Sequence, residues 1–141
     1  MSTEKIFLDA NILFSVAYRS SSLDHLWELS KKGFCALLAS NYVIEEARRN
    51  LTTQEQLRKL DICLSNVEIV LEADPTLSCP IELPEKDRPV LMAAISAKAN
   101  YFLTGDIEHF GKYFGNTIMG VRICLPRDYL ESRLKLSPTS P

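Results

Sequence analysis

Short apolar runs alternate along the chain with longer stretches in which apolar residues recur at helical spacing. Each run is too short for a typical buried helix, and several are rich in Val, Ile, Phe or Tyr, so the pattern predicts buried strands. The expected strands cover residues 5–8, 34–39, 67–71, 101–103 and 121–125. The first of them ends where the polar residues Asp9 and Asn11 follow directly.

Four of the intervening stretches predict helices. The first has N-cap candidates among the serines at residues 20–22, and Gly33 is placed to end it. Its expected inner face consists of Leu23, Leu26, Trp27 and Ser30. The other helices are expected over residues 41–50, 53–64 and 89–99. The last of these contains VLMAAISA, which is apolar nearly all round and is therefore typical of a helix packed deep against a sheet.

Strands that alternate with helices imply β-α-β units, hence an α/β fold with a mostly parallel sheet covered on both faces. The chain has 141 residues, enough for one domain, which we place at residues 1–136. Residues 74–85 form a proline-punctuated loop, and residues 137–141 are expected to be a flexible C-terminal tail.

Composition narrows the class of protein without identifying it. Hydrophobic residues make up 46% and charged residues 24%, which is ordinary for a globular protein and excludes a fibre or a disordered chain. The N-terminus lacks a long apolar segment, so we expect a cytoplasmic protein that is not associated with a membrane. The formal net charge of −2 argues against a general polyanion binder but allows a nuclease, whose catalytic carboxylates add negative charge.

The four cysteines show no C-x-x-C spacing, which argues against a zinc site. In a reducing compartment they are expected to be free thiols.

Two acidic residues follow predicted strands. Asp9 ends the first, and Asp106 follows the fourth across Thr104 and Gly105. Ligands of parallel sheets bind beyond the carboxyl ends of the strands, so the two carboxylates share one crevice if those strands are neighbours. Hard cations such as Mg²⁺ and Mn²⁺ prefer oxygen ligands. A set of acids therefore suits metal-dependent phosphodiester hydrolysis better than zinc chemistry.

The helix at residues 41–50 carries two adjacent glutamates. A helical wheel places Glu46 on the flank of the apolar face, where its side chain can lean over the sheet edge, and places Glu45 nearly opposite that face. We therefore favour Glu46 as an acid of the site, and Glu45 stays open as the alternative.

Asp87 precedes Arg88 and Pro89 at the start of the last predicted helix. We expect the start of this helix at the sheet edge opposite Asp106, so that the preceding loop or a bent helix must carry Asp87 to the site. Taken singly, Asp9, Asp87 and Asp106 could each be an ordinary helix cap or turn residue.

Four segments together resemble the PIN-domain nuclease family. Asp9-Ala10-Asn11 resembles its first motif, and SNYVIEE, which ends at Glu46, resembles its second. The strongest similarity runs from KDRPVL, which contains Asp87, to YFLTGD, which ends at Asp106, and then to His109 and Phe110. The resemblance spans roughly residues 5–129.

This resemblance implies a three-layer α/β/α sandwich with a parallel sheet of four to five strands. It also implies hydrolysis of single-stranded RNA with Mg²⁺ or Mn²⁺ as cofactor, through in-line attack by a water molecule that the metal activates. The implied catalytic and metal-binding residues are Asp9, Glu46, Asp87 and Asp106, with Asn11 and Thr104 in support. Many members of this size are toxins of toxin–antitoxin pairs and many are homodimers, so an antitoxin protein and a second copy of the chain are the implied partners.

Arg48, Arg49 and His109 are candidates for contact with the RNA backbone. The alternative for both arginines is simple solvation, and for His109 it is packing against a short helix that ends at Phe110. The main alternative function is a non-catalytic PIN-fold module that binds RNA or protein, which predicts a poor metal site. An aspartyl-phosphate phosphatase is disfavoured because Asn11 stands where it needs a second Asp.

Overall fold

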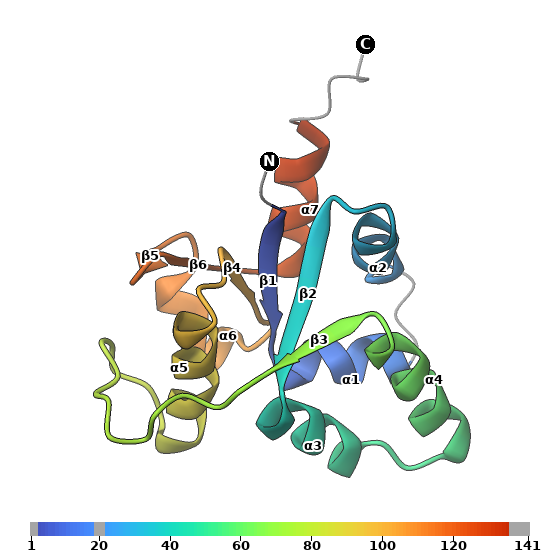
Figure 1. The fold of residues 1–141 in the computed structure, drawn as a ribbon, viewed down its shortest axis with the longest axis horizontal. Coiled ribbons are helices and arrows are strands. Elements are labelled where there is room, and N and C mark those ends of the chain that lie inside the picture. Colours follow the sequence, from blue (N-terminus) through green and yellow to red (C-terminus); the bar gives the residue numbers. More distant parts are fainter. Residues whose placement is uncertain (1–2, 19–21, 136–141) are drawn as a thin grey trace.

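A computed structural model of the chain describes residues 3–18 and 22–135. Its sheet has the strand order β3-β2-β1-β4-β6-β5 (Figure 1). The strands are β1 (Glu4–Leu8), β2 (Cys35–Ser40), β3 (Val67–Val70), β4 (Tyr101–Leu103), β5 (Thr117–Ile118) and β6 (Val121–Cys124). Five of them pair in parallel, which confirms the predicted parallel sheet. The sixth, β5, was not predicted: its two residues pair antiparallel with β6 at the sheet edge.

Helices cover both faces of this sheet (Figure 1), which gives the expected three-layer sandwich. They are α1 (Ala10–Tyr18), α2 (Asp24–Lys31), α3 (Asn41–Asn50), α4 (Gln54–Leu64), α5 (Arg88–Ser96), α6 (Ile107–Phe110) and α7 (Pro126–Lys135). Two short 3₁₀ turns, η1 (Glu85–Asp87) and η2 (Gly111–Tyr113), precede α5 and follow α6.

Local sequence explains several helix ends. Thr53 and Gln56 form a capping box at the start of α4, in which the Thr53 side chain accepts from the Gln56 backbone N–H and the Gln56 side chain accepts in return. The prediction for α2 was wrong in its first turn, because Leu23 is the N-cap rather than a serine. Two of the three serine candidates, residues 20 and 21, lie outside the described residues, as does the proposed tail at residues 137–141.

A column of aromatic side chains links the sheet to the segment after β4. Phe102 is fully buried between Phe7, at 5.9 Å between ring centroids, and Phe110, at 5.0 Å. Rings at these separations stabilise each other beyond their buried area. Phe110 ends α6 and thereby holds this one-turn helix against β4.

The four cysteines all lie within the described residues and are free thiols, as predicted. Across residues 3–18 and 22–135 no helix is long and apolar enough to cross a membrane.

Candidate active site

The carboxyl ends of β1 and β4 lie side by side at one edge of the sheet. Leu8 is in register with Leu103, and the backbone N–H of Asp9 donates to the carbonyl of Leu103 at 3.0 Å. The two strands predicted to carry acids are therefore neighbours, and Asp9 is 5% exposed at their junction.

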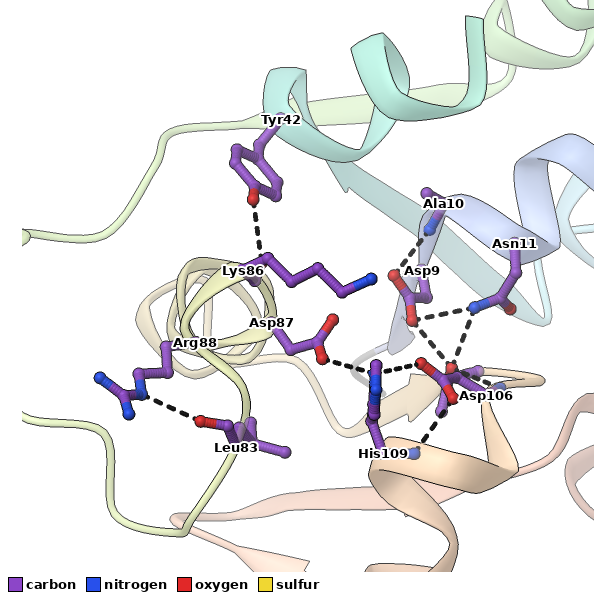
Figure 2. Close-up of polar contacts among 11 residues, drawn as sticks. Asp9, Ala10, Asn11, Tyr42, Leu83, Lys86, Asp87, Arg88, Asp106 and His109 are labelled. Atoms are coloured by element: carbon purple, nitrogen blue, oxygen red, sulfur yellow. Dashed lines mark hydrogen bonds and ion pairs between the residues drawn. The ribbon is translucent and has the colours of Figure 1, made fainter. Parts of the chain in front are cut away.

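A hydrogen-bond network fixes the carboxylate of Asp9 (Figure 2). Its Oδ1 accepts from the backbone N–H of Ala10 at 2.8 Å, and its Oδ2 accepts from the hydroxyl of Thr104 at 2.8 Å and the amide of Asn11 at 3.1 Å. The amide oxygen of Asn11 also accepts from the backbone N–H of Gly105 at 2.7 Å. A Cβ at Gly105 would lie 3.4 Å from that oxygen, which is an ordinary van der Waals contact.

The same network reaches Asp106. Its backbone N–H donates to the hydroxyl of Thr104 at 3.1 Å, and its Oδ1 accepts from the backbone N–H of His109 at 3.1 Å. Asp106 therefore caps α6 through its side chain, which is the ordinary helix-cap role that the sequence left open for it. Its second oxygen, Oδ2, is not used for capping.

Asp87 lies at the same sheet edge as Asp106, so the expectation that the start of its helix lies at the opposite edge was wrong. In a β-α-β unit the connecting helix runs antiparallel to the strands, and its N-terminus therefore lies beside their carboxyl ends. α5 obeys this rule, and no bent helix is needed. Asp87 occupies the N-cap position of α5 but makes no side-chain capping hydrogen bond, so its carboxylate is directed elsewhere.

The imidazole of His109 joins the two carboxylates. Its Nδ1 lies 2.8 Å from Oδ2 of Asp87 and 2.9 Å from Oδ2 of Asp106 (Figure 2). Asp87 is 9% exposed and the His109 side chain 23%. Within the described part of the chain, one oxygen or nitrogen atom from each of the three residues lies within 4.8 Å of the other two, close enough to share a metal ion.

Burial and mutual repulsion disfavour the charged forms of two acids. Burial raises the pKa of Asp9 to about 6 against the hydrogen bonds from Thr104 and Ala10, which lower it, and the charges of Glu46 and Asp87 raise it further. Burial also raises the pKa of Asp87, opposed by the charges of His109 and Lys86. A cation at this edge would stabilise both carboxylates in their charged forms.

The structure separates the two glutamates of α3. Glu46 is half-buried, and its charge acts on Asp9, whereas Glu45 is exposed. Glu45 instead lines a neighbouring pocket of about 1260 Å³, together with Arg49 and the loop that follows β3. The placement agrees with the helical wheel that favoured Glu46.

The predicted RNA-contacting residues fall in different places. Arg48 forms an ion pair with Asp61 of α4, with 3.0 Å between Nη1 and Oδ1. Arg49 faces the pocket beside Glu45. His109 is the one member of the three that lies among the acids.

Two residues near the acids were missed by sequence reasoning. The hydroxyl of Tyr42 donates to the carbonyl of Lys86 at 2.9 Å and so ties α3 to the turn that carries Asp87. The Lys86 side chain extends toward the acids in Figure 2. Lys86 could have been recognised from its position directly before Asp87. Tyr42 could not, because its hydrogen-bond partner is a backbone carbonyl far away in the sequence.

Comparison with known proteins identifies a family and a similar solved structure. A family model described as PIN domain matches residues 5–108. The fold is similar to a chain in the crystal structure of VapBC2 from Rickettsia felis bound to a DNA fragment from their promoter, with a TM-score of 0.59 and 19% identity. That similarity covers 84% of this chain and 96% of the other. No curated protein matches the sequence.

Proposed function

This chain belongs to the PIN-domain family, whose members are generally nucleases, and on that premise we propose that it is a metal-dependent endoribonuclease acting on single-stranded RNA. The observation that carries the proposal is the convergence of Asp9, Asp87 and Asp106 at one sheet edge. Three acids from separate segments meet there, and two of them have raised pKa values. Such a grouping is unfavourable for stability alone and is typical of a functional site.

The residues present fit Mg²⁺ or Mn²⁺. Asp9, Asp87 and Asp106 would hold the ion, with Glu46 on the flank of the site, and together they offer the oxygen ligands that these cations prefer. A bound cation supplies a Lewis acid that activates water and stabilises negative charge on the phosphoryl group.

The chain's own residues orient the site. Thr104 and Asn11 hold the Asp9 carboxylate in one position, so that no reorganisation is needed when RNA binds. Tyr42 holds the turn that carries Asp87 and Lys86. The ammonium of Lys86 extends toward the acids (Figure 2), where it would attract the RNA phosphate.

Cleavage of a fluorescently labelled single-stranded RNA tests the proposal, with Mn²⁺, with Mg²⁺ and with EDTA. Asp9→Asn and Asp106→Asn remove acids of the site, and Asp24→Asn changes an exposed acid at the start of α2 as the matched control. We expect metal-dependent cleavage by the wild type and Asp24→Asn alone. Equal cleavage by all four proteins would identify a contaminating nuclease.

One observation favours the non-catalytic alternative. His109 already occupies one oxygen of Asp87 and one of Asp106, which weakens the site if the imidazole stays there. This reading predicts that calorimetry detects no Mn²⁺ or Mg²⁺ binding and that no RNA is cut. Metal binding with a fixed stoichiometry would exclude it.

We further propose that the chain is the toxin of a toxin–antitoxin pair, with an antitoxin protein as partner, and that it forms a homodimer in the cytoplasm. The similar Rickettsia structure, a VapBC2 complex, is consistent with a partner protein. Expression of the wild type should arrest growth, and Asp9→Asn should relieve the arrest. Normal growth of cells that express active protein would argue against the toxin role, but it would not contradict the nuclease proposal. Sedimentation equilibrium tests the dimer.

A further inference from the structure

His109 is held so that one ring nitrogen faces two carboxylates. The backbone N–H of His109 donates to Oδ1 of Asp106, which fixes the start of α6, and the next residue, Phe110, is fully buried against Phe102. These two contacts fix the backbone at His109. From this position the Nδ1 of the imidazole lies 2.8 and 2.9 Å from the Oδ2 atoms of Asp87 and Asp106.

Three potential metal ligands meet at one shielded point. Oδ2 of Asp87 and Nδ1 of His109 are both shielded from solvent and lie 2.8 Å apart, and Oδ2 of Asp106 lies 2.9 Å from the same nitrogen. A single N–H at Nδ1 can point at only one of the two carboxylate oxygens, so the imidazole leaves the other oxygen without that hydrogen. Among the described residues the three ligand atoms lie within 4.8 Å of one another, so one cation could bind all three at once.

We propose that His109 is a metal ligand through Nδ1, and that it makes the site of Asp87 and Asp106 prefer Mn²⁺ over Mg²⁺. The inference rests on the metal site of the proposed function and deepens it. Mg²⁺ binds oxygen ligands almost exclusively, whereas imidazole is a common ligand of transition metals. A nitrogen ligand therefore strengthens binding of Mn²⁺ and leaves Mg²⁺ with little gain.

The competing role for His109 is that of a positively charged counterion. A protonated imidazole between two carboxylates would occupy the place of the metal rather than bind it. Removing His109 would then leave two unpaired acids and tighten the binding of both cations. The two roles predict changes of opposite sign, so they can be separated by measurement.

The test measures metal binding directly, without RNA. Affinities for Mn²⁺ and Mg²⁺ are obtained by calorimetry, and pulsed electron paramagnetic resonance of bound Mn²⁺ detects coupling to a ligand nitrogen. The variants are His109→Ala and His109→Asn, the second being close in shape and offering an amide oxygen near the position of Nδ1. His25→Ala is the matched control, because His25 is exposed on α2 and pairs only with Glu28 within the described residues.

We expect nitrogen coupling in the wild type and in His25→Ala, and none in either His109 variant. The Mn²⁺ affinity of the His109 variants should fall by about tenfold or more, while the Mg²⁺ affinity changes by less than about threefold. Unchanged or tighter Mn²⁺ binding after loss of His109, or Mn²⁺ binding without nitrogen coupling in the wild type, would overturn this inference and leave the nuclease proposal standing. Absence of metal binding by the wild type would overturn both. Circular dichroism establishes that each variant is folded.

Discussion

Asp9 destabilises the metal-free fold when it is charged, and this cost can be measured. The carboxyl is 5% exposed, and burial raises its pKa to about 6 from an ordinary value of 3.8. One pKa unit is worth about 1.4 kcal/mol, so the difference amounts to about 3 kcal/mol. Asp9→Asn replaces the acid by a neutral group of the same shape and removes this pH-dependent cost.

The sign of this pH dependence follows from the pH at which the folded and the unfolded chain each release the proton of Asp9. Below about pH 3, Asp9 is protonated in both the folded and the unfolded chain, and it contributes no pH dependence. As the pH rises toward 6, the unfolded chain loses the proton first, so the free energy of unfolding falls. The loss is complete above about pH 7. The Asn variant should therefore gain about 3 kcal/mol relative to the wild type between pH 3 and pH 8.

Urea unfolding in EDTA at several pH values measures this difference. The Asn amide cannot make all the hydrogen bonds of the carboxylate, and this lowers the stability of the variant by an amount that does not depend on pH. The test is therefore how the stability difference between variant and wild type changes with pH. Asp24→Asn, at an exposed position, should give a nearly flat difference. A flat difference for Asp9→Asn as well would refute the assigned burial cost. Added Mn²⁺ at pH 8 should stabilise the wild type and not Asp9→Asn.

Three further predictions concern the supporting residues. Thr104→Val removes the hydroxyl that joins Asp9 to Asp106, so urea unfolding should show a loss of about 1–3 kcal/mol and RNA cleavage should fall. Thr104→Ser keeps the hydroxyl and should retain both stability and cleavage. Equal activity in the Val and Ser variants would contradict the role of this hydroxyl. Phe110→Ala should cost about 3–5 kcal/mol in the same assay, and a loss below about 1 kcal/mol would show that the aromatic column is dispensable. Thr53→Ala should cost about 1 kcal/mol through the cap of α4 without changing cleavage, and a changed cleavage rate would contradict that separation.

Much of the sheet could be predicted because each parallel strand carries its own signal. The runs that form β1, β2, β4 and β6 are short, apolar and bounded by polar residues, which is the pattern of a strand buried on both faces. β5 has two residues and no such pattern. α7 was missed for a related reason, since the side chains of residues 126–133 lie mostly at the surface and only Tyr129 among them is buried.

The positions of side chains relative to one another were less predictable than the elements. Asn11 and Thr104 each lie two positions from an acid of the site in the sequence. Their contact with these acids could therefore be expected. The convergence of Asp87 with His109 could not, because it depends on how α5 and α6 pack against the same sheet edge. Arg48 illustrates the same limit: its partner Asp61 comes from another helix, and nothing in the local sequence indicates that pairing.

The place of Asp87 shows that topology carries information that local patterns do not. Its residue type and its position before Pro89 fit an ordinary N-cap, yet the side chain makes no capping bond. The polarity of β-α-β units alone requires the start of α5 to lie beside the carboxyl ends of the strands, and this requirement follows from the element order that the sequence already predicted. Any acid at the start of a helix that connects two parallel strands is therefore a candidate for the same crevice as the acids that end those strands. In this chain the rule brings together Asp87 and Asp106, which are 19 positions apart and approach the site from opposite ends of one helix–strand unit.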